Sequence, residues 1–175
     1  MVSTRNRVEV MHGVNLDMLG SRDKDIYGDF TLPELEVRIK RFARQLNLEA
    51  AFFDTNSEGE LVEHLHRLPE RADAAIINAG AWTHYSWAIR DALDLTDVPT
   101  VEVHLSDISK REEWRRHSVF EGLDLLIAQI YGKGPEGYSE ALELIAERLG
   151  VSTHMVKKYL AQSLVHCRRR MARLG

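Results

Sequence analysis

The sequence predicts an α/β fold, a three-layer sandwich with helices on both faces of a parallel sheet. Short runs of apolar and β-branched residues alternate along the chain with longer segments whose apolar residues recur at helical spacing. Strands that alternate with helices in this way form right-handed βαβ units, whose crossover helices cover the sheet. The run Ala74–Asn78 is almost uniformly apolar, which is typical of a central strand buried on both faces.

The composition is that of one ordinary globular domain. The chain has 175 residues, of which 44% are hydrophobic and 29% charged, so it can bury a substantial core. A net charge of -4 gives no general attraction to nucleic acid or membranes. The single cysteine, Cys167, excludes an internal disulfide and fits a reducing compartment. Because there is no signal-peptide pattern and no apolar run long enough to span a bilayer, we expect a cytoplasmic protein.

The first strand, at residues 7–11, runs into a long polar loop. Residues 13–28 contain several glycines and no regular apolar pattern, and loops of this length are usually lids or binding loops. Arg22 and Tyr27 are its chemically capable side chains. A guanidinium near the phenol would favour the phenolate and make Tyr27 a base. A surface arginine beside a packing tyrosine explains the same residues without chemistry.

A helix, a strand and a second helix follow. Thr31 and Glu34 form a capping box at the start of the first helix. Glu49–Asp54 reads as the second strand, and residues 55–59 form a turn before the second helix. The apolar residues at helical spacing are Leu32, Leu35, Ile39, Phe42 and Leu46 in the first helix, and Leu61, Leu65 and Leu68 in the second.

A loop of small and polar residues follows the third strand, Ala74–Asn78. Residues 78–86 carry amide, hydroxyl and imidazole groups, and residues 87–93 resume as a helix that contains Arg90 and Asp91. Asn78 stands at the strand end, where it can hydrogen-bond a substrate or an ordered water. Capping of the loop is the alternative role, since asparagine often hydrogen-bonds its own backbone in turns.

The segment 101–116 carries the densest chemistry. Residues 101–106 read as a short buried strand, and Glu102 and His104 are two apart, so they point to the same face. A carboxylate beside an imidazole can fix its tautomer and raise its pKa, which makes a usable general acid. Ligands of open α/β sheets bind outside the carboxyl ends of strands, where this pair would lie. A helix with donors suited to a carboxylate or phosphate is expected next, and these donors are Ser106, Arg111, Arg115 and Arg116. The alternative is a Glu-His pair that caps the core, with a solvated basic helix after it.

The chain ends in a strand, a helix and a basic extension. Residues 123–131 read as the fifth strand, and Glu136–Leu149 as the last helix of a domain that spans residues 1–150. Residues 151–175 form a separate helical extension without any Asp or Glu. Its cationic residues are Lys157, Lys158, Arg168, Arg169, Arg170 and Arg173.

Several motifs in a defined order resemble the type II 3-dehydroquinate dehydratases (type II dehydroquinases), and the likeness covers residues 8–149. Each motif alone is weak, whereas their joint order and spacing are highly specific. They are Gly-x-Asn-Leu-x-x-Leu-Gly-x-Arg ending in Tyr-Gly (13–28), Asn-x-Glu-Gly-Glu-Leu (56–61), Ile-Asn-x-Gly-Ala-Trp-Thr-His (77–84), Ala-x-Arg-Asp-Ala-Leu (88–93), Glu-Val-His-Leu-Ser (102–106), Arg-Glu-Glu-Trp-Arg (111–115) and Gly-x-Gly-x-x-Gly-Tyr (132–138).

The resemblance implies a flavodoxin-like fold and a cofactor-free, metal-free anti elimination of water from 3-dehydroquinate, in the shikimate or quinate pathway. Tyr27, assisted by Arg22, resembles the base that removes a proton from C2. Asn78 resembles the residue that steadies the enolate through a water. His104 resembles the general acid that protonates the departing C1 hydroxyl, with Glu102 behind it.

The resemblance also implies the substrate-binding residues and an assembly. Asp91 resembles a residue that reaches a neighbouring subunit's site, within a dodecamer built from trimers. Arg111 matches an arginine that faces the lid. The expected partners are therefore a small-molecule substrate and further copies of the chain, with neither a membrane nor nucleic acid. The residues similar to the binders of the substrate carboxylate and hydroxyls are His84, Leu105, Ser106 and Arg115.

Some positions depart from the family's usual pattern. Val14, Lys24 and Ala79 replace prolines, so the lid and the Asn78 loop are expected to be less pre-set. Asp107 replaces an asparagine and adds negative charge near a site for an anion, which should oppose binding. His12 and Asp17 also stand where the family has asparagine. These departures bear on rate and on the exact substrate, and they leave a relative that acts on another cyclic hydroxy-acid as an alternative.

The extension adds a third hypothesis from another class. Residues 145–160 are similar to the helix-turn-helix of sigma-factor region 4, so a DNA-binding regulator could use the α/β body as a ligand sensor. The alternative is an extra C-terminal helix that packs on the body or on a sister subunit. Intact Tyr27, Arg22 and His104 favour the enzyme, because a sensor needs no base and no acid.

Overall fold

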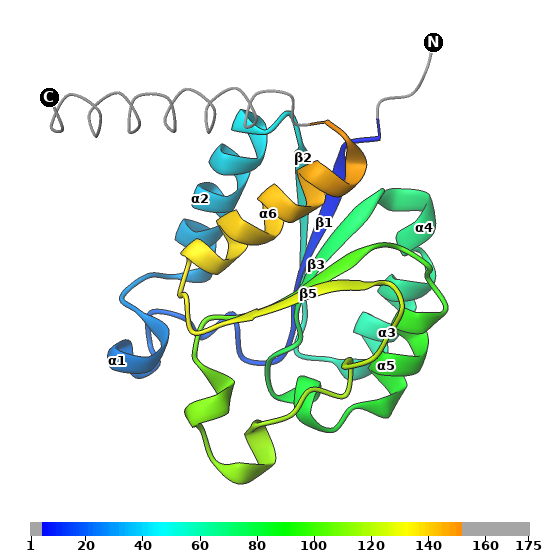
Figure 1. Cartoon of the computed structure of the whole chain (residues 1–175). Coiled ribbons are helices and arrows are strands. Elements are labelled where there is room, and N and C mark those ends of the chain that lie inside the picture. The colour runs from blue at the N-terminus through cyan, green and yellow to red at the C-terminus, as the bar shows by residue number, and fades with distance from the viewer. Residues whose placement is uncertain (1–4, 152–175) are drawn as a thin grey trace, which may run out of the picture.

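A five-stranded sheet forms the centre of the computed structural model, which describes residues 5–151 (Figure 1). All neighbouring strands pair in parallel, in the order β2-β1-β3-β4-β5. The strands are β1 (Arg7–His12), β2 (Glu49–Asp54), β3 (Ala74–Asn78), β4 (Thr100–His104) and β5 (Leu126–Tyr131). The predicted parallel α/β sandwich is therefore confirmed.

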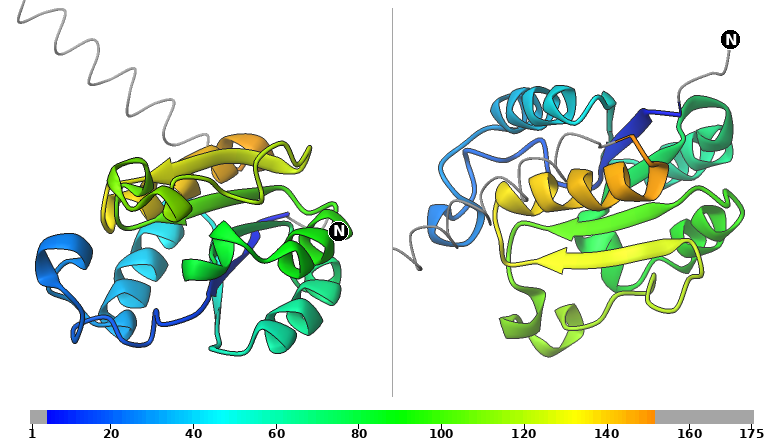
Figure 2. Two further views of the ribbon diagram at one scale, coloured as in Figure 1. Left: turned by 90° about the horizontal axis from the view of Figure 1, so that it is seen from below. Right: turned by 45° about the horizontal axis from the view of Figure 1, so that its top comes forward.

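Helices cover both faces of the sheet. The helices α2 (Leu32–Gln45) and α6 (Glu136–Leu149) pack on one face, and Figure 2 shows α6 lying along β4 and β5. The other face is covered by α3 (Glu58–His66), α4 (Leu68–Arg71) and α5 (Trp87–Asp94). Each face has its own hydrophobic core, because neighbouring strand residues point to opposite sides.

Local sequence signals account for the ends of the elements. Thr31 caps α2, and the predicted capping box with Glu34 is present in both directions. The helix α6 ends at Gly150, whose left-handed φ of 68° suits glycine at a helix end. The remaining short segments are α1 (Lys24–Tyr27), within the long loop after β1, and 3₁₀ turns at Gly80–His84, Ile108–Lys110 and Glu113–Arg115.

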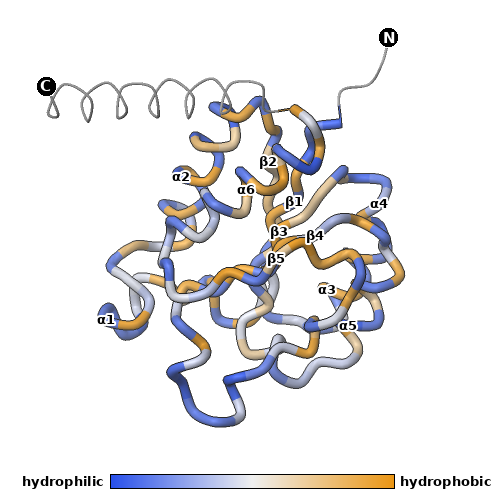
Figure 3. Tube along the Cα trace, viewed as in Figure 1, coloured by the Kyte–Doolittle hydropathy of each residue, from blue (hydrophilic) through white to orange (hydrophobic). Residues whose placement is uncertain are grey.

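The predicted arginine-rich helix after β4 is wrong, because two 3₁₀ turns occupy that segment. Arg111, between the turns, has extended backbone with φ −90° and ψ −176°. Figure 3 shows this connection as largely hydrophilic, so a helix there would have no apolar stripe to bury. The fifth strand also begins later than predicted, because residues 123–126 form a turn that buries Leu123 in the core.

The strand order places a switch point between β1 and β3. The chain leaves β1 toward β2 on one side, and it leaves β3 toward β4 on the other, so the loops after these neighbouring strands diverge. Such a point is where open α/β sheets bind ligands. The two strand ends also approach closely: the Gly13 N–H donates to the Asn78 carbonyl (2.8 Å), and a Cβ on Gly13 would lie 2.5 Å from the Ala79 carbonyl oxygen.

The predicted extension is largely outside the described part of the chain. Only Val151 of residues 151–175 is described, so the helix-turn-helix hypothesis and Cys167 lie outside the described residues. Between residues 5 and 151, no helix has both the length and the apolar character needed to cross a membrane.

Candidate active site

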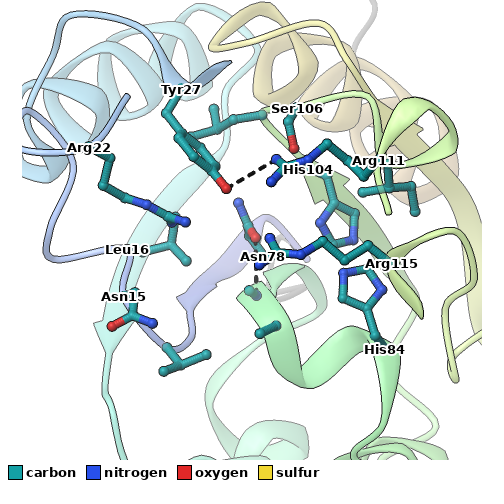
Figure 4. Close-up of a pocket in the computed structure, with 15 residues that line it drawn as sticks. Asn15, Leu16, Arg22, Tyr27, Asn78, His84, His104, Ser106, Arg111 and Arg115 are labelled. Carbon is teal, nitrogen blue, oxygen red and sulfur yellow. Dashed lines mark hydrogen bonds between the residues drawn. The ribbon is translucent and has the colours of Figure 1, made fainter. Parts of the chain in front are cut away.

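A pocket lies at the carboxyl ends of β1, β3 and β4, at the switch point (Figure 4). It brings together predicted site residues from four separate stretches of sequence: Arg22 and Tyr27, Asn78 and His84, His104, Leu105 and Ser106, and Arg111 and Arg115. Three predicted residues do not line it, and one of them, Arg116, donates instead to the Arg111 carbonyl (2.9 Å). Glu102 lies behind His104, and Asp91 is exposed on α5.

Tyr27 is surrounded by arginines. The guanidinium carbon of Arg22 lies 3.7 Å from the centre of the phenol ring, so this arginine stacks on the ring face. Arg111 donates a hydrogen bond of 3.2 Å to the phenol oxygen, a contact that the sequence did not reveal. Burial raises the pKa of Tyr27, but the Arg111 hydrogen bond and the charges of Arg22, Arg111 and Arg115 outweigh it, so the pKa is below its usual value. The phenol is thus prepared to act as a base.

Glu102 and His104 form a buried pair on β4. Glu102 is completely buried, and its Oε1 accepts a hydrogen bond of 2.9 Å from His104 Nε2. Thr83, Ser118 and Gln129 also donate to the carboxylate, at 2.8, 2.8 and 2.7 Å. Burial raises the pKa of Glu102, yet the His104 hydrogen bond and charge and the other donors lower it below its usual value. The carboxylate therefore stays ionised, and its negative charge lies beside the His104 imidazole.

His84 lies beside His104, with ring centres 6.1 Å apart. Its Nδ1 lies 2.8 Å from the His117 carbonyl oxygen, so Nδ1 carries the proton and Nε2 is left as an acceptor. Burial lowers the pKa of His84, and this effect outweighs the raising effect of the His117 hydrogen bond; the charges of His104 and Arg115 lower the pKa further, and that of Glu102 raises it. A neutral His84 can accept a hydrogen bond from a ligand hydroxyl.

Arg115 lines the pocket, and its Nε is buried. Its Nε lies 3.4 Å from a carboxylate oxygen of Glu112, within ion-pair distance but without hydrogen-bond geometry. We therefore regard the Nε–H as available for another acceptor. A buried guanidinium donor is suited to a ligand carboxylate, which it can bind with directional hydrogen bonds.

Comparison with known proteins decides the family. The model of the family described as dehydroquinase class II matches residues 6–146. The chain belongs to the class II dehydroquinase family. It is 44% identical to the 3-dehydroquinate dehydratase of Pelotomaculum thermopropionicum, over 82% of this chain and 99% of that protein. The Thermotoga maritima 3-dehydroquinate dehydratase is 48% identical, over 82% and 96% of the two chains.

Solved structures agree with the family. The type II dehydroquinase from Propionibacterium acnes superimposes with a TM-score of 0.77 at 37% identity, over 81% of this chain and 97% of that one. A 3-dehydroquinate dehydratase-like protein from Bifidobacterium longum is more distant, with a TM-score of 0.57 and 26% identity over 83% and 98% of the chains. The fold therefore corresponds to that of class II dehydroquinases.

This dehydroquinase pocket is also lined by residues that the sequence did not predict. Asn15 has a left-handed φ of 64°, and its backbone N–H donates to the Asn56 side chain (2.7 Å), which also donates to Asp17 (2.9 Å). Asn15 belongs to the Gly-x-Asn-Leu motif, and its residue type alone does not indicate this backbone contact. The other residues that were not predicted to line the pocket are Val14, Leu16, Gly80, Ala81 and Ile108.

Among the positions that depart from the family pattern, only Val14 lines the pocket. The Asp107 carboxylate accepts hydrogen bonds from Ser109 and pairs with Lys110 at 3.0 Å, so its charge is compensated locally. The expected opposition of Asp107 to anion binding is therefore reduced. Ala79 has φ −72°, which is the value that a proline would impose, so the Asn78 loop keeps a proline-like backbone at this position.

Proposed function

We propose that the chain is a 3-dehydroquinate dehydratase, which removes water from 3-dehydroquinate to give 3-dehydroshikimate, a step of the shikimate and quinate routes. The observation that carries the proposal is the opposition, within one pocket, of an arginine-surrounded phenol and a carboxylate-backed imidazole. An elimination needs this combination of a base and an acid. The names of the relatives point to the same reaction.

Tyr27 acts as the base. As the phenolate it takes a proton from C2 of the substrate, and the electron pair of the C–H bond passes into the neighbouring ketone to form an enolate. Arg22 and Arg111 favour the phenolate, since each places a positive charge on the ring face or at the oxygen. The phenol can then return its proton to solvent after product release.

His104 acts as the acid. Its Nε2 is held by Glu102, which leaves Nδ1 as the nitrogen that transfers a proton to the C1 hydroxyl. The enolate collapses as the C1–O bond breaks, and the hydroxyl leaves as water. Asn78 steadies the enolate through a bridging water, because its amide lies at the end of β3 within the same pocket. No metal or cofactor enters this sequence of steps.

Arg115 binds the substrate carboxylate, and Leu105 and Ser106 bind it through their backbone and hydroxyl groups. The buried Nε–H of Arg115 supports this assignment, since it has no hydrogen-bond acceptor within residues 5–151. His84 accepts from a substrate hydroxyl through Nε2. Arg111 serves both the substrate and Tyr27, because it reaches the pocket from the segment between the two 3₁₀ turns.

The positions of the family departures favour 3-dehydroquinate over another cyclic hydroxy-acid. His12, Ala79 and Asp107 do not line the pocket. They therefore affect the residues behind the pocket and not the surface that contacts the substrate. Val14 contributes only an aliphatic side chain. An altered substrate would require altered groups at the contact surface, since specificity depends on polar groups that the ligand leaves paired or unpaired.

Asp91 completes the site of a neighbouring subunit, within trimers that assemble into a dodecamer. Its helix supports this proposal, because Trp87 and Leu95, one turn before and after Asp91, are exposed to 68% and 73%. Large apolar side chains around an acidic residue are suited to an interface. Sedimentation with and without residues 151–175 tests both the assembly and the proposed boundary after Gly150. A monomer in both forms would contradict the role of Asp91.

The rise of enone absorbance on mixing the purified protein with 3-dehydroquinate tests the reaction. Replacing Tyr27 with phenylalanine should lower kcat by about 10²- to 10⁴-fold, the usual contribution of a positioned base. Tyr85→Phe is the matched control, because Tyr85 is 55% exposed and does not line the pocket. A folded wild-type protein without turnover would refute the proposed function, and an active Tyr27→Phe variant would refute the assignment of the base.

A further inference from the structure

A chain of buried polar groups leads from the pocket into the layer between the sheet and α6. It begins at Asn78, continues through the hydroxyl of Tyr138 on α6, and ends at the ring of His12 on β1. We propose that Tyr138 and His12 are positioning residues that fix the orientation of the Asn78 side-chain amide, so that it presents the same donor and acceptor to every ligand. This inference rests on the proposed function of the pocket.

Two hydrogen bonds hold the side-chain amide of Asn78. Asn78 Nδ2 donates a hydrogen bond of 3.1 Å to the Tyr138 hydroxyl, while Asn78 Oδ1 accepts one of 3.3 Å from the Gly80 N–H. If the amide were turned over, Nδ2 would face the Gly80 N–H, donor against donor. The amide proton not given to Tyr138 and the second lone pair of Oδ1 then remain for a ligand or its bridging water.

The hydroxyl of Tyr138 lies between Asn78 and His12. Tyr138 is buried, and its oxygen accepts from Asn78, so its own proton needs an acceptor. His12 Nδ1 lies 3.5 Å from that oxygen. Nδ1 can accept only if the ring is neutral and carries its proton on Nε2. Without such an acceptor the hydroxyl would turn toward Asn78 and compete with the amide hydrogen bond.

The protonation state of His12 decides whether its Nδ1 can accept from Tyr138. The ring is completely buried and stacks parallel to Phe52, with ring centres 6.3 Å apart. Burial lowers the pKa of His12 to about 4, so the ring is neutral near pH 7. The charged group that faces it from α2 is Glu36, whose Oε1 lies 3.8 Å from Nε2, and Asp54 on β2 is its backbone neighbour. Burial and the charge of Asp54 raise the pKa of Glu36. The negative charge of Glu36 is thereby disfavoured, so Glu36 attracts a second proton to the His12 ring less strongly.

Asparagine stands at position 12 in the family pattern, and this difference gives the proposal its specificity. An asparagine carbonyl is a shorter acceptor, whereas the His12 ring fills the layer up to Glu36 and brings its nitrogen toward Tyr138. The polar chain therefore uses a residue that this sequence does not share with the family motif. Neither His12 nor Tyr138 touches the pocket, so both act only through Asn78.

Kinetics of Tyr138→Phe, alone and combined with Asn78→Ala, test the inference. Tyr138→Phe removes one oxygen and should lower kcat/KM by roughly 2- to 12-fold, the effect of one net hydrogen bond. In the Asn78→Ala background the same change should have no further effect, because the amide is gone. His12→Phe keeps the ring stacking and should behave like Tyr138→Phe, whereas His12→Asn keeps an acceptor, although a shorter one, and should lose less activity than His12→Phe. Thr100→Val is the control, since it removes a buried hydroxyl hydrogen bond outside the pocket.

The side-chain amide signals of Asn78 in nitrogen-15 NMR spectra provide a readout that does not depend on turnover. In the wild-type protein these protons should exchange slowly, and Tyr138→Phe and His12→Phe should accelerate their exchange. Unchanged kcat/KM and unchanged amide exchange in both variants would overturn the inference while leaving the dehydratase proposal intact. Additive losses in the Asn78→Ala background would overturn it as well. A wild-type protein without turnover would refute the proposed function, and the amide exchange would still decide the positioning role.

Discussion

Replacing Glu102 with glutamine would test how the charge behind His104 supports acid catalysis. The change keeps the size and shape of the side chain and removes only the negative charge. Within residues 5–151, each hydrogen-bond partner of the carboxylate acts as a donor to it, namely Thr83, His104, Ser118 and Gln129. The new NH₂ group would therefore face a present donor on whichever side it lies, and it finds an acceptor only if the Thr83 or Ser118 hydroxyl rotates or the Gln129 amide turns over.

The expected cost has two parts. A buried donor without an acceptor costs about 1–3 kcal/mol, so the free energy of unfolding should fall by about that amount. The lowered pKa of Glu102 sets the sign of the pH dependence: its contribution is present above the carboxyl pKa of the unfolded chain, roughly 4.3, and is lost as the pH falls through the lower folded value. Loss of the charge also removes the support of a protonated His104, so kcat should fall by about 10²- to 10⁴-fold.

The assay combines enone kinetics with urea unfolding at pH 7 and below pH 4. Ser118→Ala is the matched control, because it removes one donor to the carboxylate and keeps the charge. It should cost about 1–3 kcal/mol of stability, because the Phe120 N–H also loses its acceptor, while kcat stays within a few-fold of wild type. The reasoning would be refuted if Glu102→Gln kept wild-type kcat, or if its stability deficit were the same below pH 4 as at pH 7.

Three further predictions concern the surroundings of the pocket. Because burial lowers the pKa of His12 to about 4 from 6.5, the unfolded chain binds more protons between these values, and stability should fall by roughly 3 kcal/mol as the pH drops through this interval. Urea titrations should show this loss in the wild type and a flatter profile in His12→Asn, and equal slopes would contradict it. Asn56→Ala should lower kcat/KM several-fold, roughly the effect of one or two lost hydrogen bonds, because the backbone of Asn15 is then unsupported. Steady-state kinetics check this, and an unchanged kcat/KM would count against a role for Asn15. Ala79→Pro should raise the free energy of unfolding by about 0.4–1 kcal/mol, because the φ of Ala79 is already −72°. A lower melting temperature would show that the proline ring clashes with β1.

The parts of the fold that were predictable are those encoded over short distances in the chain. The capping box of Thr31 and Glu34 needs three residues of separation, and the shared face of Glu102 and His104 needs two. The burial of Ala74–Asn78 on both faces follows from a uniformly apolar strand. These features are set by helix and strand geometry, so a sequence pattern suffices to find them.

The parts that were not predictable depend on contacts between distant segments. Arg111 and Tyr27 are 84 residues apart, and their contact exists only because the two connections converge over the same strand ends. Thr83, Ser118 and Gln129 meet at Glu102 from different elements, and ordinary hydroxyl and amide residues give no local sign of such a role. The arginine-rich connection failed as a helix prediction for a related reason: spacing of charges without an apolar stripe does not determine a helix.

The acid and the base of the pocket are supported in different ways. His104 stands at the end of a fully buried strand, so its position follows from the packing of the core. Tyr27 belongs to α1, which has no fully buried residue; its half-buried ring packs against the core and is held by Arg22 and Arg111 from polar segments. Segments with few buried apolar contacts are the least stable parts of a fold. Substitutions around His104 should therefore lower both turnover and global stability, whereas substitutions around Tyr27 should lower turnover with a smaller loss of stability.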